Sequence, residues 1–579
     1  MTKLRVTVSL SLILSLCVVS DLSWAKNWNT KSKDKPKDIL DVLVDESIAS
    51  DKKTIQRFQI QLTQLGFDIE SRDGTLNGDT KLALSDFVKQ FTFNKGVILN
   101  ETLIEQINRV HHGRFSSPFS STILAKPPIF SSTNWIATTD IRKDVPDCED
   151  CRVTTFMLTS GDMDGDGIDE IVLGTHRQDP NWRAVNESSP LKIISLKNGK
   201  AKLDQILALT QVPSRVHERE ALIRDFNGDG QGDLFVASHG LDAKPFPGEQ
   251  NILILSTPQG HINVSRSNLP LLDDMAHGVD AGDIDGDGDL DLFVITNEGS
   301  ENIIPYILIN DGYGRFTKQN ITTVSEKSLF DFTKRNRKHR AQYSTVRFAD
   351  LNQDGAVDIL LLARGEAPHE VDKFKGTKNS LVIYNDGLGQ FPIENLTELP
   401  NGRWGFGTFT NDAEVLDLNG DGRLDLILTQ STREANGGAW RGHYLQVLIN
   451  DGNRFVDQSS ETLWPQGYGD NISEFAFADK TTLSDIDGDG DLDIVTRSLG
   501  PTFKDDDKAM IVQIGINDGS GVFVATNPKW FQDVRPHQGR SPIAGDFNGD
   551  QVTDIATYRL NHIPSNDQTV GIHLFVQTD

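Results

Sequence analysis

An acidic, glycine-rich loop of nine residues recurs seven times, and this repeat limits what the chain can fold into more than any other feature. The copies occupy residues 162–170, 225–233, 283–291, 350–358, 417–425, 485–493 and 546–554. Their first positions are 63, 58, 67, 67, 68 and 61 residues apart. A nearly constant period of this size indicates a repeat protein in which each loop belongs to one supersecondary unit.

The loops have the composition of a cation site. Each offers side-chain oxygens at positions 1, 3, 5 and 9, and Gly at position 4 or 6 lets the chain curl. Six to eight oxygen ligands suit Ca²⁺ better than Mg²⁺. One such loop could be an ordinary Asp/Gly turn, but seven in phase predict up to seven structural Ca²⁺ ions. The predicted side-chain ligands are Asp162, Asp164, Asp166, Glu170, Asp225, Asn227, Asp229, Asp233, Asp283, Asp285, Asp287, Asp291, Asp350, Asn352, Asp354, Asp358, Asp417, Asn419, Asp421, Asp425, Asp485, Asp487, Asp489, Asp493, Asp546, Asn548, Asp550 and Asp554.

The residues after each loop favour a β-hairpin over an EF-hand. An EF-hand needs a Glu at position 12 and a helix, whereas position 12 here is apolar at Leu173, Val294 and Leu428. A short apolar run follows, which is typical of a buried strand. An Asn-Asp-Gly turn, a hairpin signal, recurs downstream at residues 310–312, 385–387, 450–452 and 517–519. The predicted fold is therefore mainly β: a seven-bladed β-propeller of four-stranded antiparallel blades, preceded by a small three-helix domain.

The last unit ends before its fourth strand. Residues 569–577 supply its third strand, and the chain stops at Asp579. We predict that the segment around residues 135–139, just before the first blade, takes the empty place and closes the ring. Without closure, the first and last blades would expose unpaired strand edges.

The loops and the Asn-Asp-Gly turns resemble FG-GAP/VCBS repeats, which are found in integrin α-subunit propellers and many bacterial surface proteins. The resemblance covers roughly residues 130–579. It implies a calcium-binding propeller, but such repeats occur in adhesins, lectin-like modules and some polysaccharide lyases. Gln353 and Gln551 replace Gly at position 4 of loop 4 and position 6 of loop 7. We expect loop 7 to bind Ca²⁺ most weakly.

The formal net charge of −26 comes largely from the loops, which hold 24 carboxylates at positions 1, 3, 5 and 9. Seven Ca²⁺ ions would bring the charge to about −12. This acidity favours cation binding and excludes nucleic acid as a partner.

Residues 1–25 read as a secretory signal peptide, and no later apolar run is long enough to span a membrane. We expect an exported protein of the periplasm, the cell surface or the extracellular space. Cys148 and Cys151 remain after cleavage, and in that compartment they favour a local disulfide over a zinc or redox site.

The region before the propeller divides into a polar linker (26–53), a helical domain (54–107) and a Ser/Pro linker (108–127), and the propeller occupies 128–579. Ile55, Phe58 and Leu62 follow helical spacing, as do Leu84 and Phe87. The pattern resembles the three-helix peptidoglycan-binding domain of bacterial cell-wall proteins. Asn77 and Val88 depart from it, which leaves wall binding open.

The ends of the blades opposite the loops carry many Arg, His and Trp residues. In a meander blade the first and third turns share one end, and the longer connections share the other. Each such residue could be a solvated charge or a packing ring, but together they predict a ligand-binding face. The predicted ligand-binding residues are Arg177, Trp182, Arg219, Arg364, Trp404, Arg433, Trp440, His443, Arg497 and Arg540.

Three functions remain open from the sequence. The first is an adhesion or binding module, expected to be a monomer, that recognises a glycan, peptidoglycan or a surface protein. The second is a polysaccharide-active enzyme, such as a lyase, on the same face. The third is an envelope assembly factor. We find no nucleophile elbow, zinc-protease motif or P-loop, so no catalytic residue is predicted.

Overall fold

The computed structural model describes the propeller and a few parts of the region before it. Its described ranges are 152–179, 183–197, 200–203, 212–296, 305–320, 343–365, 379–392, 395–433, 440–463, 480–488, 491–497, 512–517, 520–525 and 542–559, together with the further strands and residues named below. Cys148, Cys151, the third predicted helix and the two predicted linkers, apart from β2 and Lys52, lie outside them.

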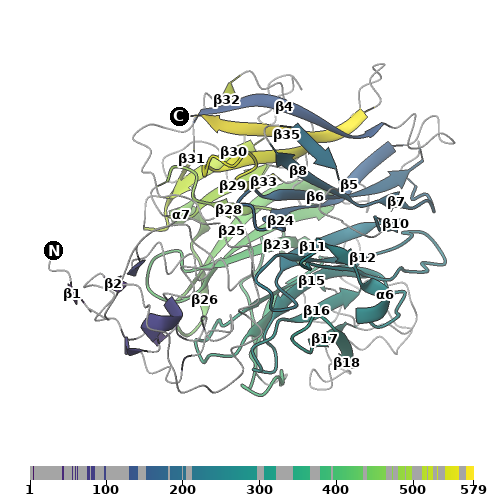
Figure 1. Cartoon of the computed structure of the whole chain (residues 1–579). Helices are drawn as coiled ribbons and strands as arrows, with labels where there is room; N and C mark the ends of the chain where they lie inside the picture. Colours follow the sequence, from purple (N-terminus) through teal and green to yellow (C-terminus); the bar gives the residue numbers. More distant parts are fainter. Residues whose placement is uncertain are drawn as a thin grey trace, which may run out of the picture.

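Seven antiparallel blades succeed one another along the chain (Figure 1), which confirms the predicted fold class. Strands A to D of blade 1 are β5 (Arg152–Gly161), β6 (Glu170–Gln178), β8 (Lys192–Lys197) and β9 (Lys200–Leu203). Blade 2 has β11 (Glu218–Arg224), β12 (Asp233–Ser238), β13 (Ile252–Leu255) and β14 (Ile262–Asn263). Blade 3 has β15 (Ala276–Gly282), β16 (Asp291–Thr296), β17 (Tyr306–Asn310) and β18 (Phe316–Asn320).

Blade 4 has β19 (Tyr343–Ala349), β20 (Asp358–Ala363), β21 (Leu381–Ile383) and β22 (Leu396–Glu398). Blade 5 has β23 (Phe409–Leu416), β24 (Asp425–Arg433), β25 (Trp440–Asn450) and β26 (Phe455–Asp457). Blade 6 has β28 (Thr482–Ser484), β29 (Asp493–Arg497), β30 (Val512–Asn517) and β31 (Phe523–Ala525). Blade 7 has β33 (Ile543–Gly545), β34 (Asp554–Arg559), β35 (Thr569–Thr578) and β4 (Ile129–Asp140).

Blade 7 is completed by a strand from before blade 1. β35 pairs antiparallel with β4 over its whole length, from Thr569↔Asp140 to Thr578↔Ile129. The two strands come from distant parts of the sequence and lie side by side in Figure 1. The predicted closing segment, residues 135–139, lies within this pairing, so the prediction is confirmed. The backbone groups of β35 that would otherwise form an open edge are thereby satisfied.

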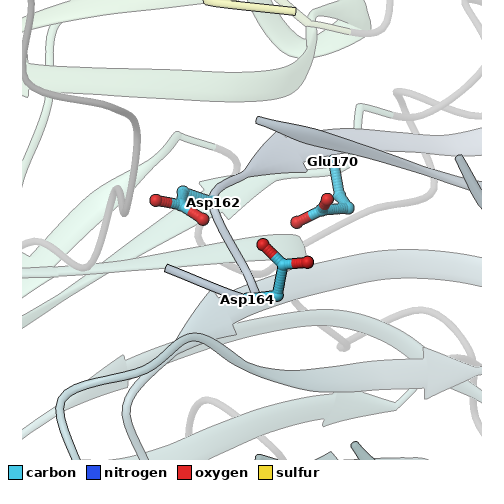
Figure 2. Close-up of side chains that lie close together, drawn as sticks. All are labelled: Asp162, Asp164 and Glu170. Atoms are coloured by element: carbon cyan, nitrogen blue, oxygen red, sulfur yellow. The ribbon is translucent and has the colours of Figure 1, made fainter. Parts of the chain in front are cut away.

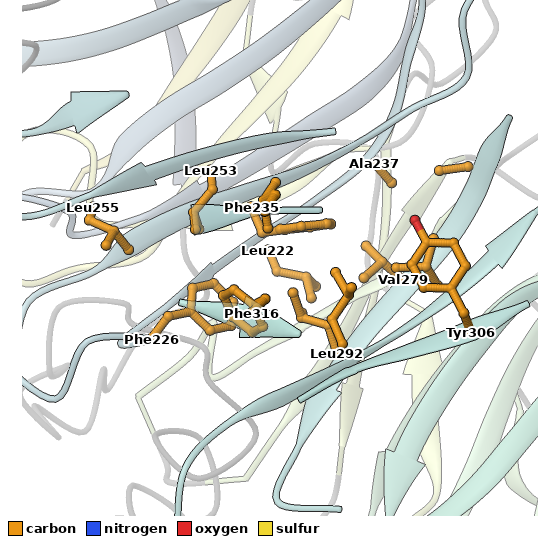
Figure 3. Packing of buried hydrophobic residues seen from close by; sticks show 14 residues of the cluster. Leu222, Phe226, Phe235, Ala237, Leu253, Leu255, Val279, Leu292, Tyr306 and Phe316 are labelled. Carbon is orange, nitrogen blue, oxygen red and sulfur yellow. The ribbon is translucent and has the colours of Figure 1, made fainter. Parts of the chain in front are cut away.

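The core lies between neighbouring blades. Every residue of β12, β16 and β20 is buried, because each strand B is covered by a blade on both sides. This explains why the strands after the loops are continuous apolar runs rather than alternating ones. Between blades 2 and 3, Phe235 and Leu253 pack with Val279 and Leu292 in one cluster (Figure 3). Burial of such side chains contributes about 1.5–3 kcal/mol each.

Blade 5 has a longer hairpin than the sequence predicts. β24 and β25 stay paired as far as Arg433↔Trp440, so these two residues lie on strands and not in a loop. β27 (Ile472–Ser473) adds to β25, and β32 (Phe531–Gln532) runs parallel to β4. The remaining elements are the ribbon of β7 (Ser189–Pro190) with β10 (Ser214–Arg215), α6 (Ser265–Asn268), α7 (Ser459–Thr462) and η5 (Gly405–Gly407).

Before the propeller, β1 (Leu4–Arg5), β2 (Val42–Val44) and β3 (Val97–Leu99) form a small sheet. Ile55, Leu62 and Leu84 are helical and buried, as expected for the first two predicted helices. The buried side chain of Gln59 joins them, because its Nε2 donates to Thr80 Oγ1 at 2.7 Å.

Candidate functional sites

The first aspartate of each loop holds the turn by accepting backbone N–H groups. In loop 1, the amides of Gly165 and Gly167 donate to Oδ1 and Oδ2 of Asp162 at 2.7 and 3.0 Å. Loops 2, 3 and 7 repeat both bonds, loops 4 and 5 repeat the bond to Oδ2, and loop 6 repeats the bond to Oδ1. The two glycines have φ angles of 74° and 84°, a region that residues with a side chain rarely adopt. The spacing of Asp and Gly therefore encodes the curl of the loop.

The ninth residue of each loop is a fully buried carboxylate at the start of strand B. In blade 4, Oδ2 of Asp358 accepts the amide of Leu351 at 2.9 Å, and Oδ1 accepts the amide of Asn385 at 3.0 Å. The first bond recurs in all seven loops, and the second recurs in blades 2 to 7. Position 9 thus ties the A–B turn to the end of strand C, a structural role that the sequence analysis missed.

Three loops bring three carboxylates within reach of one cation. The groups are Asp162, Asp164 and Glu170 (Figure 2), then Asp283, Asp285 and Asp291, then Asp485, Asp487 and Asp493, and within each group the ligand atoms lie within 4.8 Å of one another. Oε1 of Glu170 is buried and accepts no hydrogen bond. A carboxylate oxygen keeps lone pairs for a metal even when it accepts one N–H. The geometry and the all-oxygen chemistry of these groups fit Ca²⁺.

The other predicted ligands are arranged differently. Position 5 is exposed in loops 1 and 3, where Asp166 and Asp287 accept the amide of position 7 at 3.1 and 3.0 Å. In loops 2, 4, 5 and 7 position 3 is Asn, and its Oδ1 accepts the amide of position 5 at 2.8–3.0 Å. Asp489 lies outside the described residues. Positions 1, 3 and 9 are therefore the ones gathered most closely.

Burial makes the loop carboxylates difficult to ionise without a cation. It raises the pKa of Asp162 to about 6, and repulsion from Asp164 and Asp166 adds to this, while the amides of Gly167 and Gly165 lower it. Burial and the charge of Asp164 raise the pKa of Glu170 to about 8. A cation at the centre of the loop would reverse these shifts, because it favours the ionised form.

In blades 3, 4 and 5, the Asn of the Asn-Asp-Gly turn joins two blades. Nδ2 of Asn310 donates to the carbonyl of Phe226, in the loop of the preceding blade, at 2.9 Å, and to that of Leu290 at 3.1 Å. Asn385 and Asn450 repeat both contacts. Blade 7 lacks the turn, and there Nε2 of Gln577 donates to the carbonyl of Ile486 at 3.2 Å. The repeated Asn before Asp-Gly could have predicted this role, because a hairpin turn alone does not require Asn at that position.

Four charged residues from strand A or just before it meet near the axis of the ring. Nη2 of Arg347 (blade 4) lies 3.1 Å from Oε1 of Glu220 (blade 2) and also contacts Asp412 (blade 5). Nζ of Lys480, just before blade 6, lies 3.0 Å from the same Oε1. Burial alone would raise the pKa of Glu220, but Lys480 and Arg347 bring it to about 2. The sequence gives no sign of this cluster, because its members lie in four different repeats.

The predicted ligand-binding residues divide between the end opposite the loops and the interior. Arg219, Arg364 and Trp404 lie at that end, and Trp404 packs edge-on against Tyr444 with ring centroids 6.4 Å apart. Arg177 forms an ion pair with Glu187 at 2.9 Å. His443 is fully buried, with Nε2 3.3 Å from Thr496 Oγ1 of blade 6. Trp182 and Arg540, and the side chains of Arg433, Trp440 and Arg497, lie outside the described residues.

A row of histidines stands between blades 1, 2 and 3 at this same end. The ring centroids of His176 and His217 are 4.2 Å apart, those of His217 and His239 are 5.1 Å apart, and those of His239 and His277 are 5.9 Å apart. Nη2 of Arg219 lies 2.7 Å from Nε2 of His277. Of this group, only Arg219 is among the predicted ligand-binding residues, and the prediction does not include His176 or His239. His176 lies at the end of strand B of blade 1, and His239 directly follows strand B of blade 2. These positions could have placed both residues on this face.

A comparison with protein-family models identifies the same repeat that the loops define. Residues 225–294, 283–361 and 485–557 match the model of the FG-GAP-like repeat, so the chain carries FG-GAP-like repeats in a seven-bladed propeller. No curated protein matches the chain. Within the described residues, no helix is both long and apolar enough to cross a membrane.

Several solved structures resemble the propeller at low identity. A rhamnogalacturonan lyase PL11 of Bacillus licheniformis is 14% identical, with a TM-score of 0.32, over 78% of this chain and 74% of that one. The V. cholerae biofilm matrix protein Bap1 is 10% identical, with a TM-score of 0.29, over 78% of this chain and 92% of that one. At these scores the likenesses carry no argument about activity.

Proposed function

We propose that the chain is an exported, calcium-stabilised β-propeller that binds a glycan or a protein ligand of the cell envelope through the face opposite its calcium loops. The observation that carries this proposal is that the two ends of the blades differ in what their side chains contact. At the loop end, the carboxylates of positions 1 and 9 accept backbone amides of the fold itself. Their oxygens are engaged in holding the scaffold, which leaves the other end for recognition.

The opposite end has side chains suited to ligand contact. Trp404 is half-buried and packs on Tyr444, and the guanidinium of Arg403 lies 5.9 Å from the centre of the Tyr444 ring. Aromatic rings beside arginines favour sugar and anionic ligands. They stand on connections between rigid blades, where binding residues commonly lie.

The region before the propeller supports the envelope part of the proposal. The helical residues that carry Ile55, Gln59 and Leu62 have a buried core face, as the peptidoglycan-binding-like pattern requires. With the apolar N-terminal segment as an export signal, this domain would hold the propeller near the cell wall.

A binding assay tests the proposal. The chain without residues 1–25 is incubated with purified cell-wall sacculi, a glycan panel and isolated surface proteins, in calcium and in chelator. We expect calcium-dependent retention that a Trp404→Ala variant weakens and that an exposed control, Tyr313→Ala at the loop end, leaves unchanged. Equal loss in both variants, or no retention on any surface, would contradict the proposal.

A polysaccharide lyase is the second candidate, and the histidine row with Arg219 is the observation that favours it. Imidazoles beside a guanidinium could move a proton next to a uronate carboxylate. Release of unsaturated products from uronic-acid polymers, followed by ultraviolet absorbance, would support the enzyme over the binder.

A further inference from the structure

Loop 5 differs from the other six loops in the residue at its position 7. That residue is Arg423, where the other loops have an apolar residue, Gln or Asp. Its side chain is half-buried and has two partners. Nε donates to the backbone carbonyl of Asn450, in the Asn-Asp-Gly turn of the same blade, at 2.7 Å, and Nη2 forms an ion pair with Oδ2 of Asp421. The guanidinium therefore joins position 5 of the loop to the neighbouring turn.

The oxygen that pairs with Arg423 is the one that position 5 can best offer to a cation. In loops 1 to 5 and in loop 7, Oδ1 of the position-5 aspartate accepts the amide of position 7, and in loop 5 this distance is 2.9 Å. Oδ2 takes no part in that bond. In loop 5 the Oδ2 atom of Asp421 already accepts a hydrogen bond from a charged donor, which a metal ion would have to displace.

Loops 4 and 7 show how the same oxygen is held without a positive charge. There Nδ2 of Asn352 and of Asn548 donates to Oδ2 of position 5 at 2.9 and 3.0 Å. An amide is neutral, and its own oxygen can ligate Ca²⁺. A guanidinium is always charged and has only donors, so it can take the place of a cation but cannot ligate one. A Ca²⁺ ion entering loop 5 would also be repelled by Arg423.

The charge of the loops points in the same direction. Over its nine residues, loop 5 has three Asp and one Arg, a net charge of −2, whereas loops 1, 3 and 6 carry −5 and loops 2, 4 and 7 carry −3. Ca²⁺ affinity depends on the number of charged ligands. Among the described residues, the carboxylates of loop 5 do not form a group within reach of one cation, as those of loops 1, 3 and 6 do. Loop 5 is therefore the loop least suited to Ca²⁺.

We infer that loop 5 binds no Ca²⁺ and that the guanidinium of Arg423 takes the place of the ion there, as an internal cation. The inference goes beyond the proposed function and rests on it only for Ca²⁺ in the other loops. It sets the largest number of bound ions at six, and it makes loop 5, rather than loop 7, the weakest calcium site. Blade 5 should also keep its A–B turn in chelator, because its cation is covalently attached.

Counting the bound ions tests the inference. Equilibrium dialysis of the full chain against radioactive Ca²⁺, at millimolar free ion, measures the number bound per chain. We expect at most six in the wild type and one more in Arg423→Gln, because this change removes the charge and frees Oδ2 of Asp421. Arg454→Gln is the matched control in the same blade, since Arg454 is exposed and pairs with Asp451 at 3.6 Å. It should leave the number of ions unchanged.

A second pair of variants tests loop 5 without changing its arginine. Asp421→Asn removes the carboxylate at position 5, and we expect the number of bound ions and their affinity to stay as in the wild type. Asp287→Asn makes the same change in loop 3, where the other ligands are gathered around one site. We expect it to weaken binding of one ion about tenfold or more. Thermal unfolding of each variant shows whether it is folded.

The outcomes separate the inference from the proposed function. Seven ions in the wild type, or the loss of one ion in a folded Asp421→Asn variant, would overturn the internal cation and leave the calcium-stabilised propeller standing. Equal numbers of ions in the wild type and a folded Arg423→Gln variant would overturn it as well. No bound ion in the wild type would overturn both the inference and the calcium part of the proposed function.

Discussion

The two ends of the blades use charge in opposite ways. At the loop end, carboxylates are repeated in every blade, and they point into the turns that they hold together. At the opposite end, the four histidines and Arg219 do not follow the repeat from blade to blade. They gather between blades 1, 2 and 3. A feature repeated in every blade serves the fold that all blades share, whereas a feature found in one place can serve a ligand. This difference predicts that changes at the loop end reduce stability and changes at the other end reduce binding.

The largest expected effect separates the structural carboxylate from the other loop ligands. Asp358→Ala leaves the buried amides of Leu351 and Asn385 without acceptors, so we expect a loss of about 3 kcal/mol in chelator. The loss should be larger in calcium, because Asp358 is also a predicted Ca²⁺ ligand. Asp354→Ala, at the exposed position 5 of the same loop, should lower stability only in calcium. Denaturant unfolding in both buffers measures this. Equal losses for the two variants in chelator would show that position 9 has no structural role of its own.

The charged cluster near the axis should give the next effect. Glu220→Gln leaves Arg347 and Lys480 without one of their counter-charges, and we expect a loss of about 3 kcal/mol near neutral pH. Because the folded pKa of Glu220, about 2, lies below its unfolded value, its contribution is complete above pH of about 4.5 and is lost as the pH falls toward 2. The stabilities of wild type and variant should therefore converge in acid. A constant difference from pH 7 to pH 2 would contradict this.

Removal of one inter-blade hydrogen-bonding side chain should have a smaller effect. Asn310→Ala deletes the contacts with the carbonyls of Phe226 and Leu290, and we expect a loss of about 1–2 kcal/mol. Asn453→Ala, at an exposed turn position of blade 5, is the control and should be nearly neutral. If Asn310→Ala were equally neutral in urea unfolding, the Asn of this turn would serve the hairpin only.

The smallest effect concerns loop 7. Gln551 has a φ of 66° where the other described loops have Gly at position 6. Gln551→Gly should relieve this backbone conformation and raise stability by less than about 1 kcal/mol, partly offset by the greater freedom of Gly in the unfolded chain. Its Ca²⁺ affinity, measured by calorimetry, should rise with it. A lower affinity would show that the glutamine side chain assists the loop.

The sequence predicts the fold well and the face opposite the calcium loops poorly, for a physical reason. Loop, strand B and turn are local in sequence and repeated, so their pattern specifies the blade, and even the closing strand follows from the missing fourth strand. The contacts of Asp358 with Asn385, of Glu220 with Lys480, and of His217 with His176 join distant positions. No periodicity marks such pairs. Arg433 and Trp440 were expected in a loop because nothing in their sequence shows that the hairpin of blade 5 continues.

Thermal unfolding in calcium and in chelator, at pH 8 and at pH 5, tests the central claim most directly. Burial raises the pKa of Glu170, Asp358 and Asp493 to about 8, above their unfolded values near 4. Without a cation, stability should therefore fall as the pH rises from about 4 through 8. We predict that chelation lowers the melting temperature strongly at pH 8 and much less at pH 5, and that calcium restores it where magnesium does not. An unchanged melting temperature on chelation at both pH values would contradict the claim that the loops are structural calcium sites.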